Sequence, residues 1–164
     1  MLKKSLALGL LGLLVLTLCA WGMGAKESEV EATAIKLTGE TIRGGYRLVS
    51  TTELSKWVEA KKPMLIVDTM PYEDSFKKEH IPGAICFELP IPEMKDMDQA
   101  LKEKFEKALG ADKNRTLVFY CGFTKCGRSH NGAMWAKKLG YTDVVRCPGG
   151  IKAWKEQGFK AGKV

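Results

Sequence analysis

A short strand that ends on a cysteine and leads through a loop into a helix constrains this chain more than any other stretch. Residues 116–120 form an apolar run typical of a buried strand, and Cys121 follows directly. A helix is predicted to begin seven residues later, at Arg128. The first N–H groups of a helix lack partners within it, and the helix dipole adds partial positive charge there. We therefore expect a lowered pKa for the Cys121 thiol, which favours the nucleophilic thiolate.

The loop after this strand carries further groups suited to holding an anion. We predict that the loop residues and the helix start bind the substrate: Gly122, Phe123, Thr124, Lys125, Cys126, Gly127, Arg128 and Ser129. Lys125 and Arg128 add positive charge beside the thiol. Cys126 has two interpretations, as a redox or sulfur-relay partner of Cys121 or as a residue that only fills the loop. The spacing alone does not give the distance that a disulfide requires.

Strand and helix patterns alternate along the rest of the chain. The predicted strands cover residues 46–49, 64–67, 84–87, 116–120 and 144–146, and the predicted helices cover 51–60, 72–79, 97–109, 128–139 and 151–157. This alternation predicts an α/β fold with a central parallel sheet of about five strands and helices on both faces. Ligands of such folds bind beyond the carboxyl ends of the strands, where both Asp68 and Cys121 are expected.

Two further residues are predicted to support the site. Asp68 ends its strand, and we expect its carboxylate to accept hydrogen bonds from neighbouring loop backbone rather than to take part in chemistry. His130 falls in the first turn of the predicted helix 128–139. It could move a proton if its ring faces the loop, since histidine titrates near neutral pH, and is otherwise structural.

The N-terminal segment has the pattern of an export signal. Lys3 and Lys4 precede an uncharged, mostly apolar run from Ser5 to Ala25 that ends in small residues. Residues 1–25 are thus predicted as a signal peptide or membrane anchor, 26–45 as a linker or lead-in, and 46–164 as the domain. Cleavage, lipidation at Cys19 and retention as an anchor remain open, and each places the domain outside a bacterial cytoplasm, in the periplasm. Membrane contact is expected only through this segment.

Composition argues against several classes of protein. The formal charge is +7, and outside Lys3 and Lys4 the positive residues are mixed with acidic ones, as in 102–107, so no nucleic-acid surface is predicted. The chain has five cysteines and two histidines, without the paired short clusters of a structural zinc site. We expect no metal and no cofactor.

Four stretches of the sequence resemble the rhodanese-like domain family. They are Leu65-Ile66-Val67-Asp68, the segment Glu73 to His80-Ile81-Pro82-Gly83-Ala84, the segment Phe119-Tyr120-Cys121 to Gly127-Arg128-Ser129, and Leu139-Gly140-Tyr141 to Gly149-Gly150-Ile151-Lys152-Ala153-Trp154. They stand in the family's order over about a hundred residues, from Leu48 to Trp154. The loop differs from the common pattern, because Arg128 and Ser129 lie seven and eight residues after the cysteine instead of five and six.

The resemblance implies a sulfurtransferase. By position, Cys121 matches the cysteine that accepts a sulfane sulfur as a persulfide and passes it to a thiophilic acceptor. The implied partners are a small sulfur-containing anion or thiol and, as a further option, a redox or sulfur-acceptor protein. The alternatives are a periplasmic thiol–disulfide or sulfur-relay protein that uses Cys121 and Cys126, and a non-catalytic binding module. A phosphatase is disfavoured, because Gly127 stands where that loop type has its arginine.

Overall fold

The computed structural model describes residues 26–164, so the predicted signal or anchor and Cys19 lie outside the described residues. The chain divides into two compact units at Ile35 and Lys36. Within the first unit, the described part is helical and belongs to α2 (Glu27–Gly44). The second unit begins in the same helix and contains the sheet and the remaining helices. None of the helices among residues 26–164 has the length and apolar character needed to cross a bilayer.

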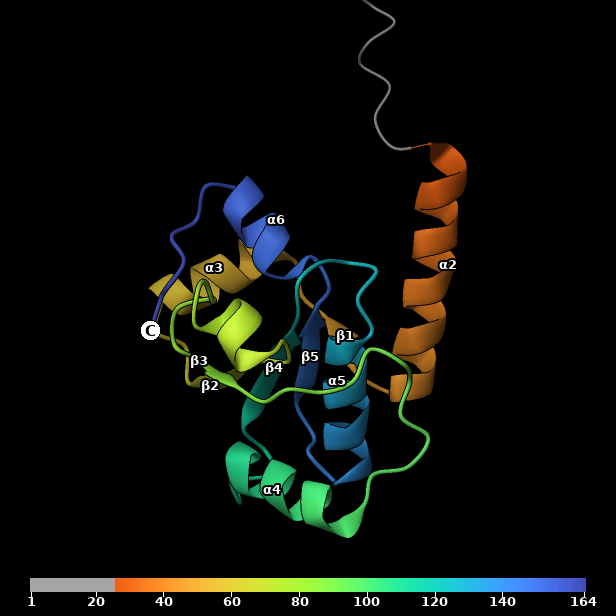
Figure 1. The fold of residues 1–164 in the computed structure, drawn as a ribbon, viewed down its shortest axis with the longest axis vertical. Coiled ribbons are helices and arrows are strands. Elements are labelled where there is room, and N and C mark those ends of the chain that lie inside the picture. The colour runs from red at the N-terminus through yellow and green to blue at the C-terminus, as the bar shows by residue number, and fades with distance from the viewer. Residues whose placement is uncertain (1–25) are drawn as a thin grey trace, which may run out of the picture. The chain divides into compact units, whose positions relative to one another are not determined.

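The second unit is built on a parallel sheet of five strands in the order β1-β5-β4-β2-β3 (Figure 1). The strands are β1 (Arg47–Leu48), β2 (Met64–Asp68), β3 (Ala84–Cys86), β4 (Thr116–Tyr120) and β5 (Val144–Cys147). The central strand β4 pairs with β2 in the register Asp68 to Tyr120 and with β5 in the register Tyr120 to Cys147. Three strands therefore end side by side, and the loop that begins at Cys121 leaves from the middle one.

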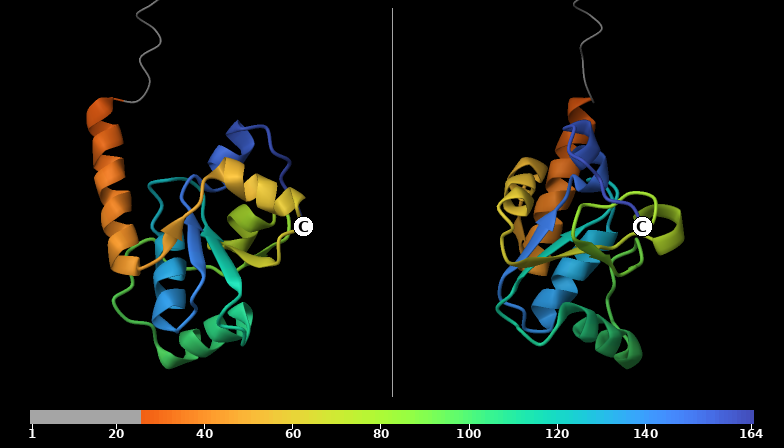
Figure 2. Two further views of the ribbon diagram at one scale, coloured as in Figure 1. Left: turned by 180° about the vertical axis from the view of Figure 1, so that it is seen from behind. Right: turned by 90° about the vertical axis from the view of Figure 1, so that its left-hand side faces the viewer.

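Helices cover both faces of this sheet, as the sequence predicts. Alternate residues of β4 enter separate cores, because successive side chains of a strand point to opposite faces. Leu117 and Phe119 pack in one core with Met134 of α5 (Arg128–Lys138). Val118 and Tyr120 pack in the other core with Leu54 of α3 (Thr51–Glu59). Figure 2 shows α3 and α5 on opposite sides of the sheet.

The helices of the second unit agree closely with the predicted ranges. They are α3 (Thr51–Glu59), the single π-helical turn η2 (Tyr72–Phe76), α4 (Gln99–Leu109), α5 (Arg128–Lys138) and α6 (Gly150–Glu156). Ser50 caps α3 by accepting a hydrogen bond from the Glu53 N–H (3.1 Å), and Asp98 caps α4 by accepting one from the Leu101 N–H (2.8 Å). Such caps satisfy N–H groups that would otherwise lack partners at a helix start.

One prediction needs correction. Residues 26–45 were expected to form a linker or loosely packed lead-in, but residues 27–44 form one helix. Its last turns belong to the second unit and bury Glu40. The physical reason is an ion pair between Glu40 and Arg146 of β5, a partner 106 residues away that local sequence cannot reveal.

Candidate active site

The loop after β4 is held against the start of α6 by backbone contacts. The Ile151 N–H donates to the Cys121 carbonyl and the Lys152 N–H to the Gly122 carbonyl, both at 3.0 Å. Gly150 makes this approach possible. It has a φ of +60°, and a Cβ built there would lie 2.0 Å from the Cys121 carbonyl oxygen. The residues around Cys121 are therefore fixed by the fold from two directions, by β4 and by α6.

We expect Gly150→Ala to destabilise the protein by more than the about 1–2 kcal/mol that a left-handed conformation costs a non-glycine residue. The added methyl group would also clash with the Cys121 carbonyl, which forces the loop to move. Gly158→Ala is the matched control, because Gly158 has a φ of +78° and open space around its Cβ position. Urea unfolding of both variants measures the difference, and equal losses would contradict the close approach at Gly150.

Cys121 is the first residue of the loop and is completely buried (0% exposed). Its Sγ lies 3.2 Å from the Ser129 hydroxyl and 3.4 Å from the Cys126 carbonyl oxygen. A hydrogen bond with the Cys126 thiol and burial raise the pKa of Cys121 well above its ordinary value. The raised pKa favours the protonated thiol, whose Sγ donates to the Cys126 carbonyl.

Cys126 is the thiol that is poised to ionise. A turn in which the Cys126 N–H donates to the Phe123 carbonyl (3.0 Å) folds the loop back over Cys121. The hydrogen bond from Cys121 lowers the pKa of Cys126 to about 6, with help from the N–H groups of Arg128 and Gly122 and from the Arg128 charge. The lowered pKa that we predicted for Cys121 is therefore wrong for that residue and applies to its neighbour. The hydrogen bond between the two cysteines is the main cause of the reversal, and the burial of Cys121 adds to it, because burial disfavours a charged thiolate.

A cavity of about 320 Å³ opens onto Cys126. It lies between the loop, the segment that leads into η2, and the chain that follows β3. Its lining residues are Met70, Pro71, Asp74, Ser75, Ile91, Phe123, Lys125, Cys126 and Arg128. The size suits a small molecule, and the wall combines apolar side chains with two cations and one carboxylate.

The other predicted loop residues surround this cavity or hold the loop in place. Phe123 is half exposed, and together with Thr124 and Lys125 it also lines a neighbouring hollow on the α6 side. The Arg128 guanidinium donates to the Leu89 carbonyl and lies 3.4 Å from the Glu88 carboxylate. Arg128 thus ties the start of α5 to the chain after β3, while its backbone N–H and charge act on Cys126.

A buried arginine that sequence analysis did not identify binds the loop through hydrogen bonds. Arg146 of β5 is fully buried, and its Nε donates to the Ser129 hydroxyl (2.9 Å) while a terminal nitrogen donates to the Cys126 carbonyl (2.9 Å). The other terminal nitrogen donates to Glu40 (2.5 Å) and to the Tyr46 hydroxyl (3.2 Å). The available signal was a single arginine in the otherwise apolar stretch Val144–Cys147.

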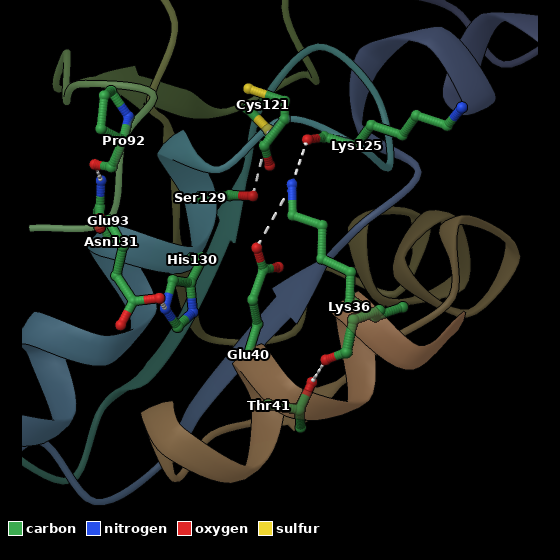
Figure 3. Close-up of polar contacts among 12 residues, drawn as sticks. Lys36, Glu40, Thr41, Pro92, Glu93, Cys121, Lys125, Ser129, His130 and Asn131 are labelled. Carbon is green, nitrogen blue, oxygen red and sulfur yellow. Dashed lines mark hydrogen bonds and ion pairs between the residues drawn. The ribbon is translucent and has the colours of Figure 1, made fainter. Parts of the chain in front are cut away.

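The end of α2 adds a second support for the loop. Lys36 donates to the Lys125 carbonyl (2.8 Å) and lies 3.6 Å from Glu40, so it bridges the loop and the buried carboxylate (Figure 3). Glu40 in turn accepts from Arg146. The loop carbonyls of Lys125 and Cys126 are therefore bound from one connected network, which fixes the backbone on both sides of the Cys126 side chain.

The two supporting residues have contacts of different kinds. Asp68 is buried and accepts a hydrogen bond from the Met70 N–H (2.9 Å), the backbone contact expected from its position, and burial raises its pKa. His130 is hydrogen-bonded through Nδ1 to the Tyr46 hydroxyl (2.8 Å), and its Nε2 lies 3.4 Å from Glu93. Burial lowers the pKa of His130, which favours the neutral ring. These contacts connect His130, through the Tyr46 hydroxyl, to Arg146.

Within residues 26–164, no three side chains of the metal-binding types gather into a group that could hold an ion. Cys86, Cys121, Cys126 and Cys147 are all free thiols. Of the predicted residues, Cys121, Cys126 and Ser129 meet in one cluster, and Asp68 and His130 lie outside it. The two sulfur atoms of this cluster can carry one negative charge and one proton between them. A thiolate of this kind can act as a sulfur nucleophile.

Comparison with known proteins gives one family match. The model of the rhodanese-like domain family matches residues 50–157. No curated protein matches the sequence significantly.

Solved structures share the fold at low sequence identity. A polysulfide-sulfur transferase homodimer from Wolinella succinogenes superposes with a TM-score of 0.58 at 13% identity, covering 87% of this chain and 95% of that one. The BH2092 protein from Bacillus halodurans gives 0.57 at 22% identity, covering 84% and 87%. A thiosulfate sulfurtransferase from Pseudomonas aeruginosa gives 0.58 at 19% identity, covering 78% of this chain and 22% of that one.

Proposed function

We propose a function on the basis that the chain belongs to the rhodanese-like domain family. The proposed activity is transfer of a sulfane sulfur, carried as a persulfide on Cys121, from a small sulfur-containing anion to a thiophilic acceptor. The observation that carries this proposal is the pair of thiols in the loop after β4, where Cys121 lies against Ser129 and the Cys126 carbonyl and Cys126 lines a cavity of suitable size.

The surroundings of Cys121 support its role as the sulfur carrier. A persulfide adds an anionic sulfur atom beyond Sγ, and this atom needs hydrogen-bond donors in a site closed to bulk water. The Ser129 hydroxyl lies 3.2 Å from Sγ and is itself held by Arg146. The N–H groups of Gly122 and Arg128 already act on the neighbouring sulfur of Cys126, so they lie within reach of a second sulfur atom.

The chemistry proceeds by exchange of one S–S bond for another. A thiolate of the loop attacks the outer sulfur of the donor, for which thiosulfate serves as the probe, and sulfite leaves with the bonding electron pair. The persulfide then gives its outer sulfur to an acceptor such as cyanide, and the cysteine thiolate is restored. No external oxidant or reductant is consumed.

The test is the intact mass of the protein after incubation with thiosulfate. We expect a gain of one sulfur atom, reversed by cyanide with formation of thiocyanate. A protein that gains no sulfur from thiosulfate, from polysulfide or from an organic persulfide would contradict the proposed transfer and leave a binding module as the better description.

A second candidate is favoured by the closeness of the two cysteines, since the Cys121 Sγ lies 3.4 Å from the Cys126 carbonyl oxygen. Two neighbouring free thiols could close a disulfide, which would make the protein a thiol–disulfide or sulfur-relay protein. In this case the intact mass would fall by two hydrogen atoms after mild oxidation, and a dithiol reductant would restore it. The same mass measurement therefore separates the two candidates.

A further inference from the structure

The two cysteines of the loop differ in their access to a substrate. Cys126 forms part of the cavity wall together with Phe123 and Arg128. Cys121 does not line the cavity and has no exposed surface. A small anion that enters from this cavity meets the Cys126 sulfur first. The family resemblance assigns the sulfur to Cys121, so the position of Cys126 raises the question of how sulfur reaches the buried residue.

The charges around the cavity favour an anionic donor at Cys126. The Arg128 guanidinium and the Lys125 side chain both border the cavity, and the Arg128 charge acts on the Cys126 sulfur. The start of α5 lies next to it, with Gly127 as the residue before the first helical turn. A negatively charged donor and a thiolate would repel each other in water, and these groups reduce that repulsion at the point of attack.

We propose that Cys126 is the entry thiol, which takes the sulfane sulfur from the donor in the cavity and passes it to Cys121. This inference rests on the proposed sulfur transfer and assigns its first step to a residue that the family pattern does not provide. The Cys121 Sγ lies 3.4 Å from the Cys126 carbonyl oxygen, so the two cysteines are neighbours in the folded loop and the handover is an exchange between adjacent residues.

Each step balances. The Cys126 thiolate forms an S–S bond with the outer sulfur of thiosulfate, the donor's S–S bond breaks, and sulfite leaves with the electron pair. The Cys121 sulfur then attacks that outer sulfur, the S–S bond to Cys126 breaks, and the proton of Cys121 passes to the Cys126 sulfur. The result is a persulfide on Cys121 and a thiol on Cys126, with no net oxidation.

The sequence allows a direct test, because Lys125 separates the two cysteines. Cleavage after lysine places Cys121 in peptide 114–125 and Cys126 in peptide 126–137. The full protein is mixed with thiosulfate, quenched with an alkylating agent at increasing times, cleaved, and the added sulfur is located by mass. We expect sulfur on 126–137 before 114–125 in the wild-type protein, and retention on 126–137 in Cys121→Ser.

Removal of the entry thiol gives the decisive comparison. We expect Cys126→Ser and Cys126→Ala to load Cys121 about tenfold more slowly or worse, which corresponds to about 1.4 kcal/mol in the barrier. Cys86→Ser is the matched control, since Cys86 is a partly buried thiol outside the loop, and it should load at the wild-type rate. Thermal unfolding of both Cys126 variants checks that they remain folded.

The outcomes separate the two proposals. Wild-type loading of Cys121 in both folded Cys126 variants would overturn the entry role and leave the sulfurtransferase proposal intact. A wild-type protein in which neither peptide gains sulfur would remove both. Sulfur on 126–137 of Cys121→Ser, with slow loading in the Cys126 variants, supports the relay.

Discussion

Arg146→Met is expected to lower the free energy of unfolding by about 3–5 kcal/mol, the usual cost of removing one partner of a buried ion pair. Arg146 is fully buried and donates to Glu40, which is also buried, so the substitution leaves a carboxylate in the interior with Lys36 as its remaining ionic neighbour. The Ser129 hydroxyl and the Cys126 carbonyl lose their hydrogen bonds from Arg146 in the same step. Urea unfolding measures the loss.

The neighbouring strand supplies a matched control. Arg47 of β1 pairs with Asp143 at 2.5 Å, but its side chain is 70% exposed. Arg47→Met should therefore cost at most about 1 kcal/mol, as exposed ion pairs do. In addition, Glu40→Gln combined with Arg146→Met should recover part of the loss, because the unpaired buried charge is then gone. Equal effects of the two arginine substitutions would contradict the structural importance of the buried pair.

Cys121→Ser is expected to reduce transfer of sulfur from thiosulfate to cyanide by a factor on the order of 10⁴ or more, since the residue that carries the sulfur to the acceptor is lost and sulfur taken up by Cys126 is not passed on. A serine hydroxyl has nearly the same size and keeps the contact with Ser129, so the fold should remain. Steady-state formation of thiocyanate is the measurement, with circular dichroism as the check on folding.

Two controls make this result specific to the loop. Cys86→Ser tests whether a change of any half-buried thiol has the same effect, and it should retain wild-type turnover. Ser129→Ala removes the hydroxyl beside Cys121 but no sulfur, and a partial loss is expected. Wild-type turnover in Cys121→Ser would remove Cys121 from the mechanism.

The sheet and most helices could be predicted from the sequence because their signals are local. Apolar runs such as Leu65–Val67 and Leu117–Tyr120 mark strands buried on both faces. The loop between β4 and α5 is also predictable from local signals, since the end of the β4 strand and the start of the following helix place Cys121 at the carboxyl end of the parallel strands. Each of these signals lies within a few residues of the element that it predicts.

The parts that the sequence did not predict depend on contacts between distant residues. Residues 26–45 are polar and end in Gly44-Gly45, which favours a linker or loosely packed lead-in, but residues 27–44 form α2. Glu40 of this helix pairs with Arg146 only in the folded chain. The reversal of the two thiol pKa values has the same origin. Burial of Cys121 comes from the sheet and α6, while the donors to Cys126 come from how the loop folds back. Spacing alone gives neither the burial nor the donors.

The central claim is that Cys126 is ionised at neutral pH and that a hydrogen bond from Cys121 stabilises its thiolate. Titration of the protein by the ultraviolet absorbance of thiolates tests this most directly. The account predicts one thiolate that appears with an apparent pKa of about 6, absent in Cys126→Ser and shifted upward in Cys121→Ala, where the donating thiol is removed. A wild-type protein with no thiolate below the ordinary titration range of cysteine, near 8.5, would contradict it.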